Sequence, residues 1–266
     1  MCLVIAYSRA VAAAPLVLAA NRDELRSRPA VAMDVLQERQ PRILGGRDLL
    51  AGGTWLAVNE WGVVAAVTND PSTAVSRDPG RRSRGEIPLR LARHRTAREA
   101  IAELHREVRG DEYNACFVLV GDRSTLHYLA LGQGIRSPPI ELPPGVHVLE
   151  NLPLEVRSRK VDFVRTTLPG PDSRRLLHGL WATLMSRAVP PGSPDPRRPP
   201  ESEAAFVDAG PYGTRWSGIV AVPPRGRPRF IYSEHSATLS KGPRWAGWNT
   251  SGLASQGGRS SSDSRT

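Results

Sequence analysis

Residues 1–24 read MCLVIAYSRAVAAAPLVLAANRDE, and this stretch decides the fold. It holds two short apolar runs, at 2–7 and 15–20, and runs of this length between polar residues or proline predict buried strands. The second run ends in a block of hydrogen-bonding side chains at 21–24. The sequence therefore predicts an early buried sheet with Cys2 at the head of its first strand.

Further strands are expected wherever short apolar runs lie between turn residues. These runs are 54–59 and 62–69, 115–121 and 125–131, 146–151, 212–222 and 227–232. The first two flank the turn NEWG and form a hairpin, as do the next two around DRS. Much of the chain is therefore antiparallel sheet.

Two helices are predicted between these strands. Thr96 and Glu99 form a capping box, after which apolar residues recur at helical spacing until Gly110. A second helix is expected from Asp172, because leucines and a tryptophan share one side of it. Strands, then helices, then strands around one core describe an α+β class.

The domain organisation follows from composition. With 266 residues, of which 40% are hydrophobic, the chain can fill a sizeable core, and we expect one domain over 1–240. The proline-rich segment 187–203 predicts a loop, because proline removes backbone donors. Residues 241–266 are mostly glycine, serine and arginine, which predicts a disordered tail.

The net charge of +10 does not indicate a specific nucleic-acid partner, since the arginines are spread along the chain and mixed with glutamates. Two cysteines without ligand spacing favour a reducing compartment, and we expect a cytoplasmic protein. No apolar run reaches the ~20 residues that span a bilayer. Residues 10–20 resemble a signal sequence, but Pro15 interrupts them and cleavage there would discard Cys2.

Cys2 has two interpretations. As a small apolar residue it can be a buried part of the first strand. Alternatively, removal of Met1 would give Cys2 a free α-amine beside its thiol. An α-amine titrates near ~8 in unperturbed peptides, so the neutral amine can take the thiol proton and one residue supplies nucleophile and base.

Two polar segments surround this residue. In the block at 21–24, Asp23 can orient the amine, while Asn21 or Arg22 can lower the thiol pKa or hold a substrate carboxylate; the alternative is a strand-end turn with a surface ion pair. The segment ILGGRDLLAGGTW at 43–55 places glycine pairs around Arg47 and Asp48, and Gly52 and Gly53 allow close backbone approach to a ligand. It can equally be a turn-rich connector.

Together these motifs resemble the NRDE family of proteins similar to transport and Golgi organisation protein 2. The resemblance rests on Cys2 behind Met1 and on five motifs that follow in order. They are AANRDE at 19–24, the continuous segment 43–69, SRGE at 83–86, VLVGD at 118–122 and YGTR at 212–215.

The resemblance implies the fold of N-terminal-nucleophile hydrolases, a four-layer αββα sandwich of two mostly antiparallel sheets. In the more distant choloylglycine hydrolase and penicillin V acylase group, a cysteine nucleophile works with an aspartate, two asparagines and an arginine. The matching positions are Cys2 as nucleophile, Asp23 on its amine, Asn69 and Asn151 at the oxyanion, and Arg215 near thiol or substrate.

Three departures from that pattern are visible. Ala20 stands where the acylase group has an arginine, if Asn21 and Asp23 are matched. Glu150 replaces a serine directly before Asn151, and a carboxylate beside an oxyanion donor would oppose the oxyanion. The segment at 233–237 reads SEHSA rather than an arginine- and aromatic-bearing strand end.

Two function classes remain open at this point. The first is a hydrolase of a carbon–nitrogen bond other than a peptide bond, or a related acyl bond, acting through a thioester. The second is a non-catalytic carrier using the same pocket for haem or an acyl lipid, since eukaryotic members of the family are associated with haem trafficking and lipid metabolism. Neither class requires a cofactor, and no histidine pair has metal-ligand spacing. The oligomeric state stays open.

Overall fold

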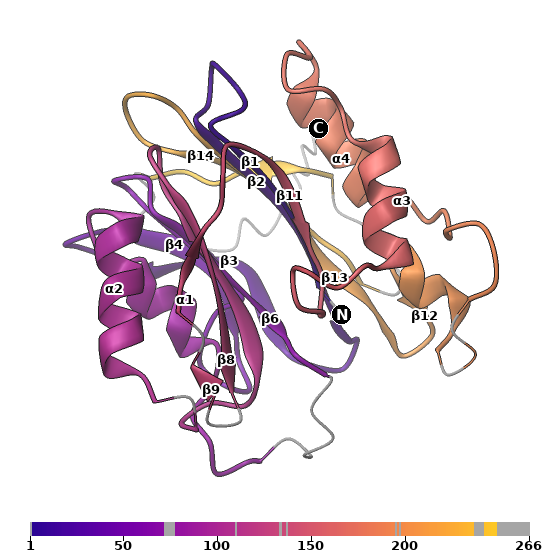
Figure 1. Ribbon diagram of the computed structural model, residues 1–266, viewed down its shortest axis with the longest axis horizontal. Helices are drawn as coiled ribbons and strands as arrows, with labels where there is room; N and C mark the ends of the chain where they lie inside the picture. The colour runs from indigo at the N-terminus through magenta and orange to yellow at the C-terminus, as the bar shows by residue number, and fades with distance from the viewer. Residues whose placement is uncertain are drawn as a thin grey trace, which may run out of the picture.

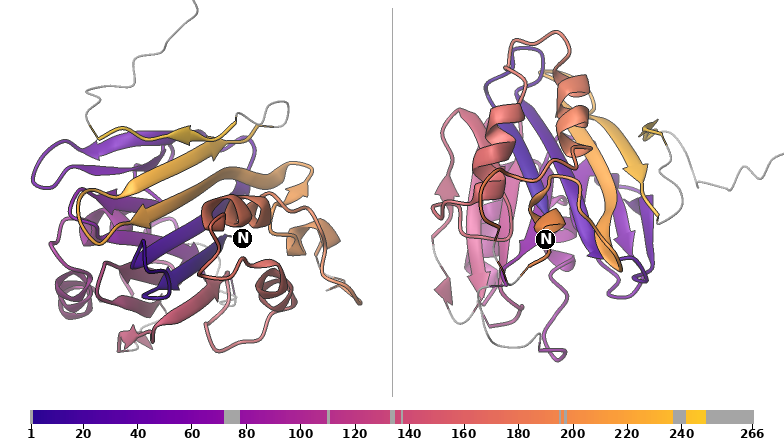
Figure 2. Two further views of the ribbon diagram at one scale, coloured as in Figure 1. Left: turned by 90° about the horizontal axis from the view of Figure 1, so that it is seen from above. Right: turned by 90° about the vertical axis from the view of Figure 1, so that its right-hand side faces the viewer.

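The computed structural model describes residues 2–71, 78–109, 111–132, 135–136, 138–194, 196, 198–236 and 242–248. Within them, two antiparallel sheets face each other, and helices cover the outer face of each (Figure 1). Figure 2 shows the same layers from two further sides, with α1 and α2 on one flank and α3 and α4 on the other. The predicted four-layer αββα sandwich is confirmed.

The first sheet contains the two N-terminal strands at its centre. Its strand order is β11-β1-β2-β13-β14-β15, and β12 pairs with β13. The strands are β1 (Leu3–Ser8), β2 (Leu16–Leu25), β11 (Gly145–Leu149), β12 (Asp208–Ala209), β13 (Tyr212–Val222), β14 (Arg229–Glu234) and β15 (Arg244–Trp245). Strand β15 lies where the sequence predicted a disordered tail, so residues 242–248 differ from that expectation. Residues 241 and 249–266 lie outside the described part.

The second sheet is built from the middle of the chain in the order β10-β8-β7-β6-β5-β4-β3, with β9 paired to β8. The strands are β3 (Ala30–Gln37), β4 (Ile43–Asp48), β5 (Leu56–Asn59), β6 (Val64–Asn69), β7 (Cys116–Gly121), β8 (Leu126–Gly132), β9 (Ile135–Arg136) and β10 (Ile140–Glu141). The predicted hairpins are β5–β6 and β7–β8. In the first, Asn59 accepts three turn N–H groups on its Oδ1.

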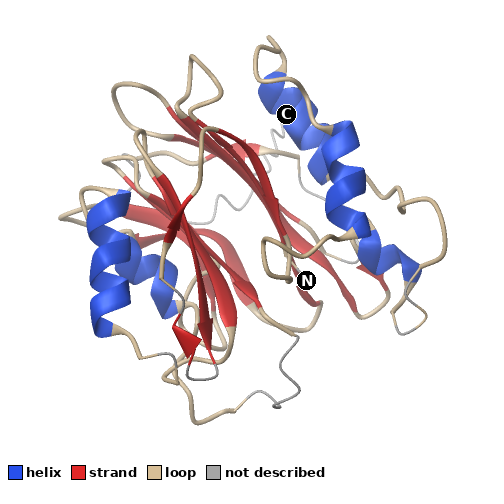
Figure 3. Cartoon of the chain, in the orientation of Figure 1, coloured by secondary structure: helices blue, strands red, loops and turns tan. Residues whose placement is uncertain are grey.

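The helices form the outer layers (Figure 3). They are α1 (Glu86–Leu91), α2 (Ala97–Glu107), α3 (Arg159–Thr167) and α4 (Leu176–Leu184), with a 3₁₀ turn at Pro200–Glu203. Thr96 caps α2 as predicted, since its side chain accepts the Glu99 N–H at 3.2 Å. The sequence predicted α2 and α4 but not α1 or α3. Among the described residues, no helix combines the length and apolarity needed to cross a membrane.

The alternation of side chains in β1 and β2 explains why both are continuously apolar. Val4 and Leu18 face the second sheet, whereas Ile5 and Ala19 face α3 and α4. A strand buried on both faces lacks the polar alternation of a half-exposed one. Leu3 pairs with Asn21, so Cys2 lies one residue beyond the paired region, beside the polar end of β2.

Candidate active site

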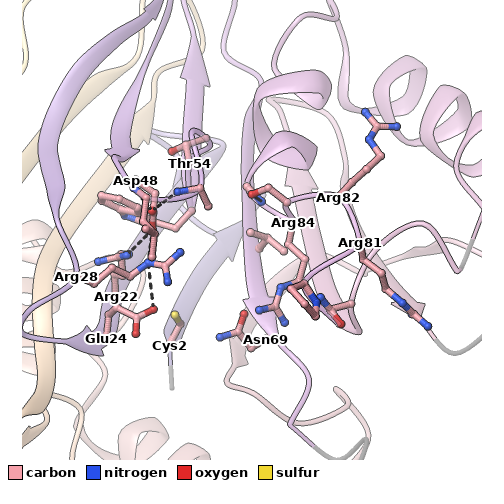
Figure 4. Close-up of a pocket in the computed structure, with 18 of the residues that line it drawn as sticks. Cys2, Arg22, Glu24, Arg28, Asp48, Thr54, Asn69, Arg81, Arg82 and Arg84 are labelled. Carbon is pink, nitrogen blue, oxygen red and sulfur yellow. Dashed lines mark hydrogen bonds and ion pairs between the residues drawn. The ribbon is translucent and has the colours of Figure 1, made fainter. Parts of the chain in front are cut away.

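A cavity of about 630 Å³ lies where β1 begins and β2, β4 and β6 end. Cys2 and the end of β2 line it from the first sheet, and Asp48 and Asn69 from the second. Residues 81–85, which lead into α1, form a further wall (Figure 4). Strand ends place polar groups here because the alternating apolar core stops at the same level.

Cys2 is half-buried at the edge of this cavity. Its backbone N–H donates to Asn151 Oδ1 at 3.1 Å. Burial raises the pKa of the Cys2 thiol, and the Asp23 charge adds to this, while the Asp23 backbone N–H and Arg22 lower the pKa in part. The net direction is upward, so the thiol is protonated at neutral pH and any reaction as a thiolate needs a base.

Asp23 lies beside this thiol as a buried carboxylate. Thr214 Oγ1 donates to Asp23 Oδ1 at 2.7 Å, and Lys160 Nζ lies 3.8 Å from Asp23 Oδ2. The side chains of Asp23 and Lys160 are at most 2% exposed, and neither Oδ2 nor Nζ has a hydrogen-bond partner among the described residues. Lys160 therefore compensates the Asp23 charge inside the fold.

Sequence reasoning missed Lys160 because it missed α3. A signal was present: Ser158 caps the helix by accepting the Val161 N–H, and Val161 and Val164 lie three residues apart. Lysine is rarely buried, so nothing in the sequence marked this one as an interior residue.

The two predicted asparagines come to the same place from different sheets. Asn69 ends β6 and lines the cavity with Cys2 (Figure 4). Asn151 follows β11, and its side-chain oxygen accepts the Cys2 N–H. The structure thus brings Cys2, Asp23, Asn69 and Asn151 together, with Asn151 on the nitrogen of Cys2.

Glu150 does not oppose an oxyanion in this arrangement. Its carboxylate accepts a hydrogen bond from the Ser158 hydroxyl at the start of α3. The residue lines a separate small pocket beside α3 and does not line the Cys2 cavity. The expected electrostatic conflict is absent because the side chain points to the helix side.

A buried charge cluster forms another wall of the cavity, and we call Arg22, Arg28, Asp48 and Trp55 the Arg22 cluster. Asp48 Oδ2 accepts from Arg22 Nη2 at 2.8 Å and Arg28 Nε at 2.7 Å. Burial opposes ionisation of Asp48, but Arg28, the Ala51 N–H and Arg22 outweigh it and lower its pKa. The Arg22 guanidinium lies over Trp55, 4.5 Å from the ring centroid.

Asn21, expected in substrate binding, is a correction. Its Nδ2 donates to the Leu184 and Ala205 carbonyls at 2.8 and 2.7 Å, and its Oδ1 accepts from Ser217 at 2.7 Å. The residue is buried and faces the α4 side of the sheet, opposite in alternation to Arg22. Its hydrogen-bonding capacity is used to hold α4 and the chain before β12.

Arg215 also lies outside the cavity lining. The register of β13 against β2 shifts between Thr214 and Trp216, and this bulge turns the Arg215 side chain to the end of β2. There it donates to the carbonyls of Leu25, Arg26, Arg28 and His235. The predicted contact with thiol or substrate is replaced by a structural one.

Three residues of the glycine-rich segment are corrections as well. Arg47 Nε pairs with Asp34 Oδ2 at 2.5 Å and does not line the cavity. Gly52 has φ +74°, and a side chain at Gly53 would collide with the Gly85 backbone. Both glycines line a neighbouring cavity of about 450 Å³ instead. Of this segment's predicted residues, only Asp48 reaches the site.

In the described part of the chain, no three His, Cys, Asp or Glu side chains converge to hold a metal ion. Cys116, the second cysteine, is buried in the core between β7 and the helices α1 and α2. Burial raises its pKa to about 12.

Comparison with known sequences gives a matching family model and several related proteins. The family model described as Transport and Golgi organisation 2 matches residues 1–237. The Transport and Golgi organization protein 2 homolog of Bos taurus is 30% identical over 259 residues, which cover 86% of this chain and 89% of that protein. The Homo sapiens homolog is 34% identical over 155 residues, covering 56% of this chain and 54% of that protein.

Comparison with solved structures identifies the fold. An N-acylethanolamine-hydrolyzing acid amidase ortholog from Caenorhabditis elegans aligns with TM-score 0.53 at 13% identity, covering 83% of this chain and 92% of that one. A mutant of conjugated bile acid hydrolase from Clostridium perfringens aligns with TM-score 0.51 at 11% identity, covering 94% and 97%. These are N-terminal-nucleophile hydrolase folds, as the sequence resemblance implied.

Proposed function

This chain belongs to the Transport and Golgi organisation 2 family, and we propose that it is a cysteine hydrolase of a non-peptide amide or related acyl bond. Cys2, freed by removal of Met1, is the nucleophile. One observation carries the proposal: Cys2 lines the cavity, its nitrogen donates to Asn151, and Asp23 and Arg22 are close enough to shift the pKa of its thiol.

The proposed reaction has two halves. The α-amine takes the thiol proton, the sulfur attacks the substrate carbonyl carbon, and a carbon–sulfur bond forms as the carbonyl oxygen becomes an oxyanion. The amine then returns the proton to the leaving nitrogen, the carbon–nitrogen bond breaks, and a thioester remains. Water, deprotonated by the amine, cleaves this thioester and releases a carboxylic acid and the free thiol.

Each neighbouring residue has a defined part in this scheme. Asp23 and Asn151 hold the amine, and Asn69 donates to the oxyanion. The raised pKa of the Cys2 thiol supports a base-dependent mechanism rather than a pre-formed thiolate. Fold neighbours named for amide and bile acid conjugate hydrolysis support the reaction class.

The test is amine release from N-acyl amides of graded chain length, followed for the wild type, Cys2→Ala and Cys116→Ala. We expect the wild type and Cys116→Ala to hydrolyse at least one of these amides at equal rates, with Cys2→Ala inactive. Equal turnover by Cys2→Ala would contradict the proposal.

A carrier of haem or an acyl lipid is the second candidate, because the cavity is open and several arginines line it. Cys2 is the only cysteine, histidine or methionine among the described lining residues, so it is the one axial ligand available to haem there. A haem titration that shifts the Soret band in the wild type but less or not at all in Cys2→Ser, with no acyl hydrolysis by the wild type, would favour the carrier. Both cysteines are free thiols, and this supports a cytoplasmic location.

A further inference from the structure

Two residues that line the Cys2 cavity carry hydrogen-bond donors without an acceptor among the described residues. Arg22 Nη1 and Trp55 Nε1 lack a hydrogen-bond partner within the described residues. Both residues line the cavity, and they are only 5% and 9% exposed. They also contact each other, since the guanidinium lies over the indole ring.

Leaving a buried donor without a hydrogen bond destabilises the folded protein. A buried donor without a partner loses the hydrogen bond it makes to water in the unfolded chain, and the loss is larger when the donor is charged. The protein has not supplied an acceptor from the nearest carboxylates. Asp48 is already shared between Arg22 and Arg28, and Glu24 lies 3.7 Å from Arg28. An acceptor for Arg22 and Trp55 has to come from outside the described residues, and a ligand in the cavity can supply one.

The chemistry of the donors selects the acceptor. A guanidinium group prefers an anionic oxygen pair, because its N–H groups form short charge-assisted bonds with carboxylates. The Trp55 ring fixes the guanidinium plane, and Asp48 holds Nη2, so the remaining N–H group is pre-oriented. Arg22 is also close enough to Cys2 for its charge to lower the thiol pKa.

We propose that Arg22 and Trp55 form a subsite for a carboxylate of the substrate, a few bonds from the carbonyl that Cys2 attacks. The substrate class is thus an amide or thioester whose leaving group, the amine or thiol attached to the reacting carbonyl, carries a carboxylate. This inference rests on the proposed function for the reaction, but recognition of the carboxylate requires only an accessible Cys2 thiol.

Alkylation of Cys2 tests the subsite without turnover. The probes are N-chloroacetylglycine and N-chloroacetylglycinamide, which differ only in a carboxylate against a neutral amide, and iodoacetamide reports intrinsic thiol reactivity. Rates are measured by intact mass and peptide mapping. We expect the carboxylate probe to label wild-type Cys2 about tenfold faster than the amide probe, the effect of one charge-assisted hydrogen bond.

Variants localise the effect. Arg22→Gln should bring the ratio of the two rates to about one. Trp55→Phe removes the indole N–H but keeps an aromatic ring beside Arg22; it should lower the ratio about threefold, and it tests the subsite should Arg22→Gln fail to fold. Arg47→Gln, an arginine outside the cavity, should keep the wild-type ratio. An equal rate for both probes on the wild type would overturn the subsite. So would an Arg22→Gln variant that slows both probes alike, because Arg22 would then act on the thiol or oxyanion alone.

The outcomes separate this subsite from the hydrolase. A tenfold preference in a protein that hydrolyses no acyl substrate supports the subsite and contradicts only the enzyme. Hydrolysis without any preference contradicts only the subsite.

Discussion

The two cysteines of this chain, one directly before the first strand of the first sheet and one within the second sheet, have opposite surroundings. Cys116 begins β7, is fully buried, and packs among apolar residues beneath α1 and α2. Cys2 stands before β1, half-buried at a cavity, with Asp23 and Asn151 on its atoms. Burial raises both thiol pKa values. Both cysteines stand at the start of a strand, so the cavity and the polar neighbours of Cys2 are what distinguish the proposed nucleophile from the core residue.

The difference between the two cysteines is tested by alkylating both thiols in the native protein. We expect iodoacetamide to modify Cys2 at least about 10³-fold faster than Cys116, because Cys116 reacts only when the core opens. Peptide mapping after timed quenching measures both rates. Denaturant should bring them within a few-fold of each other, and similar rates in the native state would contradict the assignment.

The second prediction tests the buried ion pair between Asp23 and Lys160 beside Cys2. Lys160→Met leaves the Asp23 carboxylate buried without its cation, and the free energy of unfolding should fall by about 3–5 kcal/mol. The double variant Asp23→Asn with Lys160→Met should recover much of this loss without recovering acyl hydrolysis. Urea unfolding measures stability. The control is Arg157→Met, which breaks an exposed ion pair between Arg157, just before α3, and Asp162, within α3. It should lower the free energy of unfolding by at most about 1 kcal/mol. An equally small effect of Lys160→Met would show that this pair carries no stability.

The third prediction concerns how the buried Cys116 thiol makes the free energy of unfolding depend on pH. Burial raises the pKa of the Cys116 thiol from 9.0 to about 12, so the unfolded state loses this proton first. The resulting stability is complete below pH 9 and is lost as pH rises toward 12. Between pH 8 and about 10.5 the contribution should decline by about 2 kcal/mol. Urea unfolding of the wild type and Cys116→Ala at both pH values isolates it, and parallel declines would contradict it.

The smallest effect is expected at Glu150. Its carboxylate binds the Ser158 hydroxyl, away from the Cys2 cavity. Glu150→Gln should therefore change Cys2 alkylation by less than about twofold and lower the free energy of unfolding by about 1 kcal/mol, the value of one hydrogen bond. Alkylation kinetics and urea unfolding measure the two effects. A large gain in Cys2 reactivity would mean that the carboxylate acts on the site after all.

The sequence was sufficient for the parts of the molecule that strand periodicity controls. The apolar runs of β1 and β2 predicted strands, and the polar groups at their ends predicted that Cys2 and Asp23 meet. The family resemblance added Asn69 and Asn151, each directly at or after the end of a strand.

The remaining residues depended on geometry that spacing does not encode. Asn21 and Arg22 are neighbours on one strand, but only the face toward the second sheet carries the Arg22 cluster. A one-residue bulge in β13 redirected Arg215 to backbone carbonyls. Lys160 came from a helix whose weak amphipathic pattern gave no strong signal, and its partner Asp23 is 137 positions away in the sequence.

The most direct measurement is intact mass and N-terminal peptide mapping of the purified full chain, quenched in acid during reaction with an activated acyl ester. The account predicts that Met1 is absent and that the acyl group sits on the Cys2 sulfur, with Cys116 unmodified. Complete retention of Met1, or an acyl group found on Cys116 and not on Cys2, would contradict it.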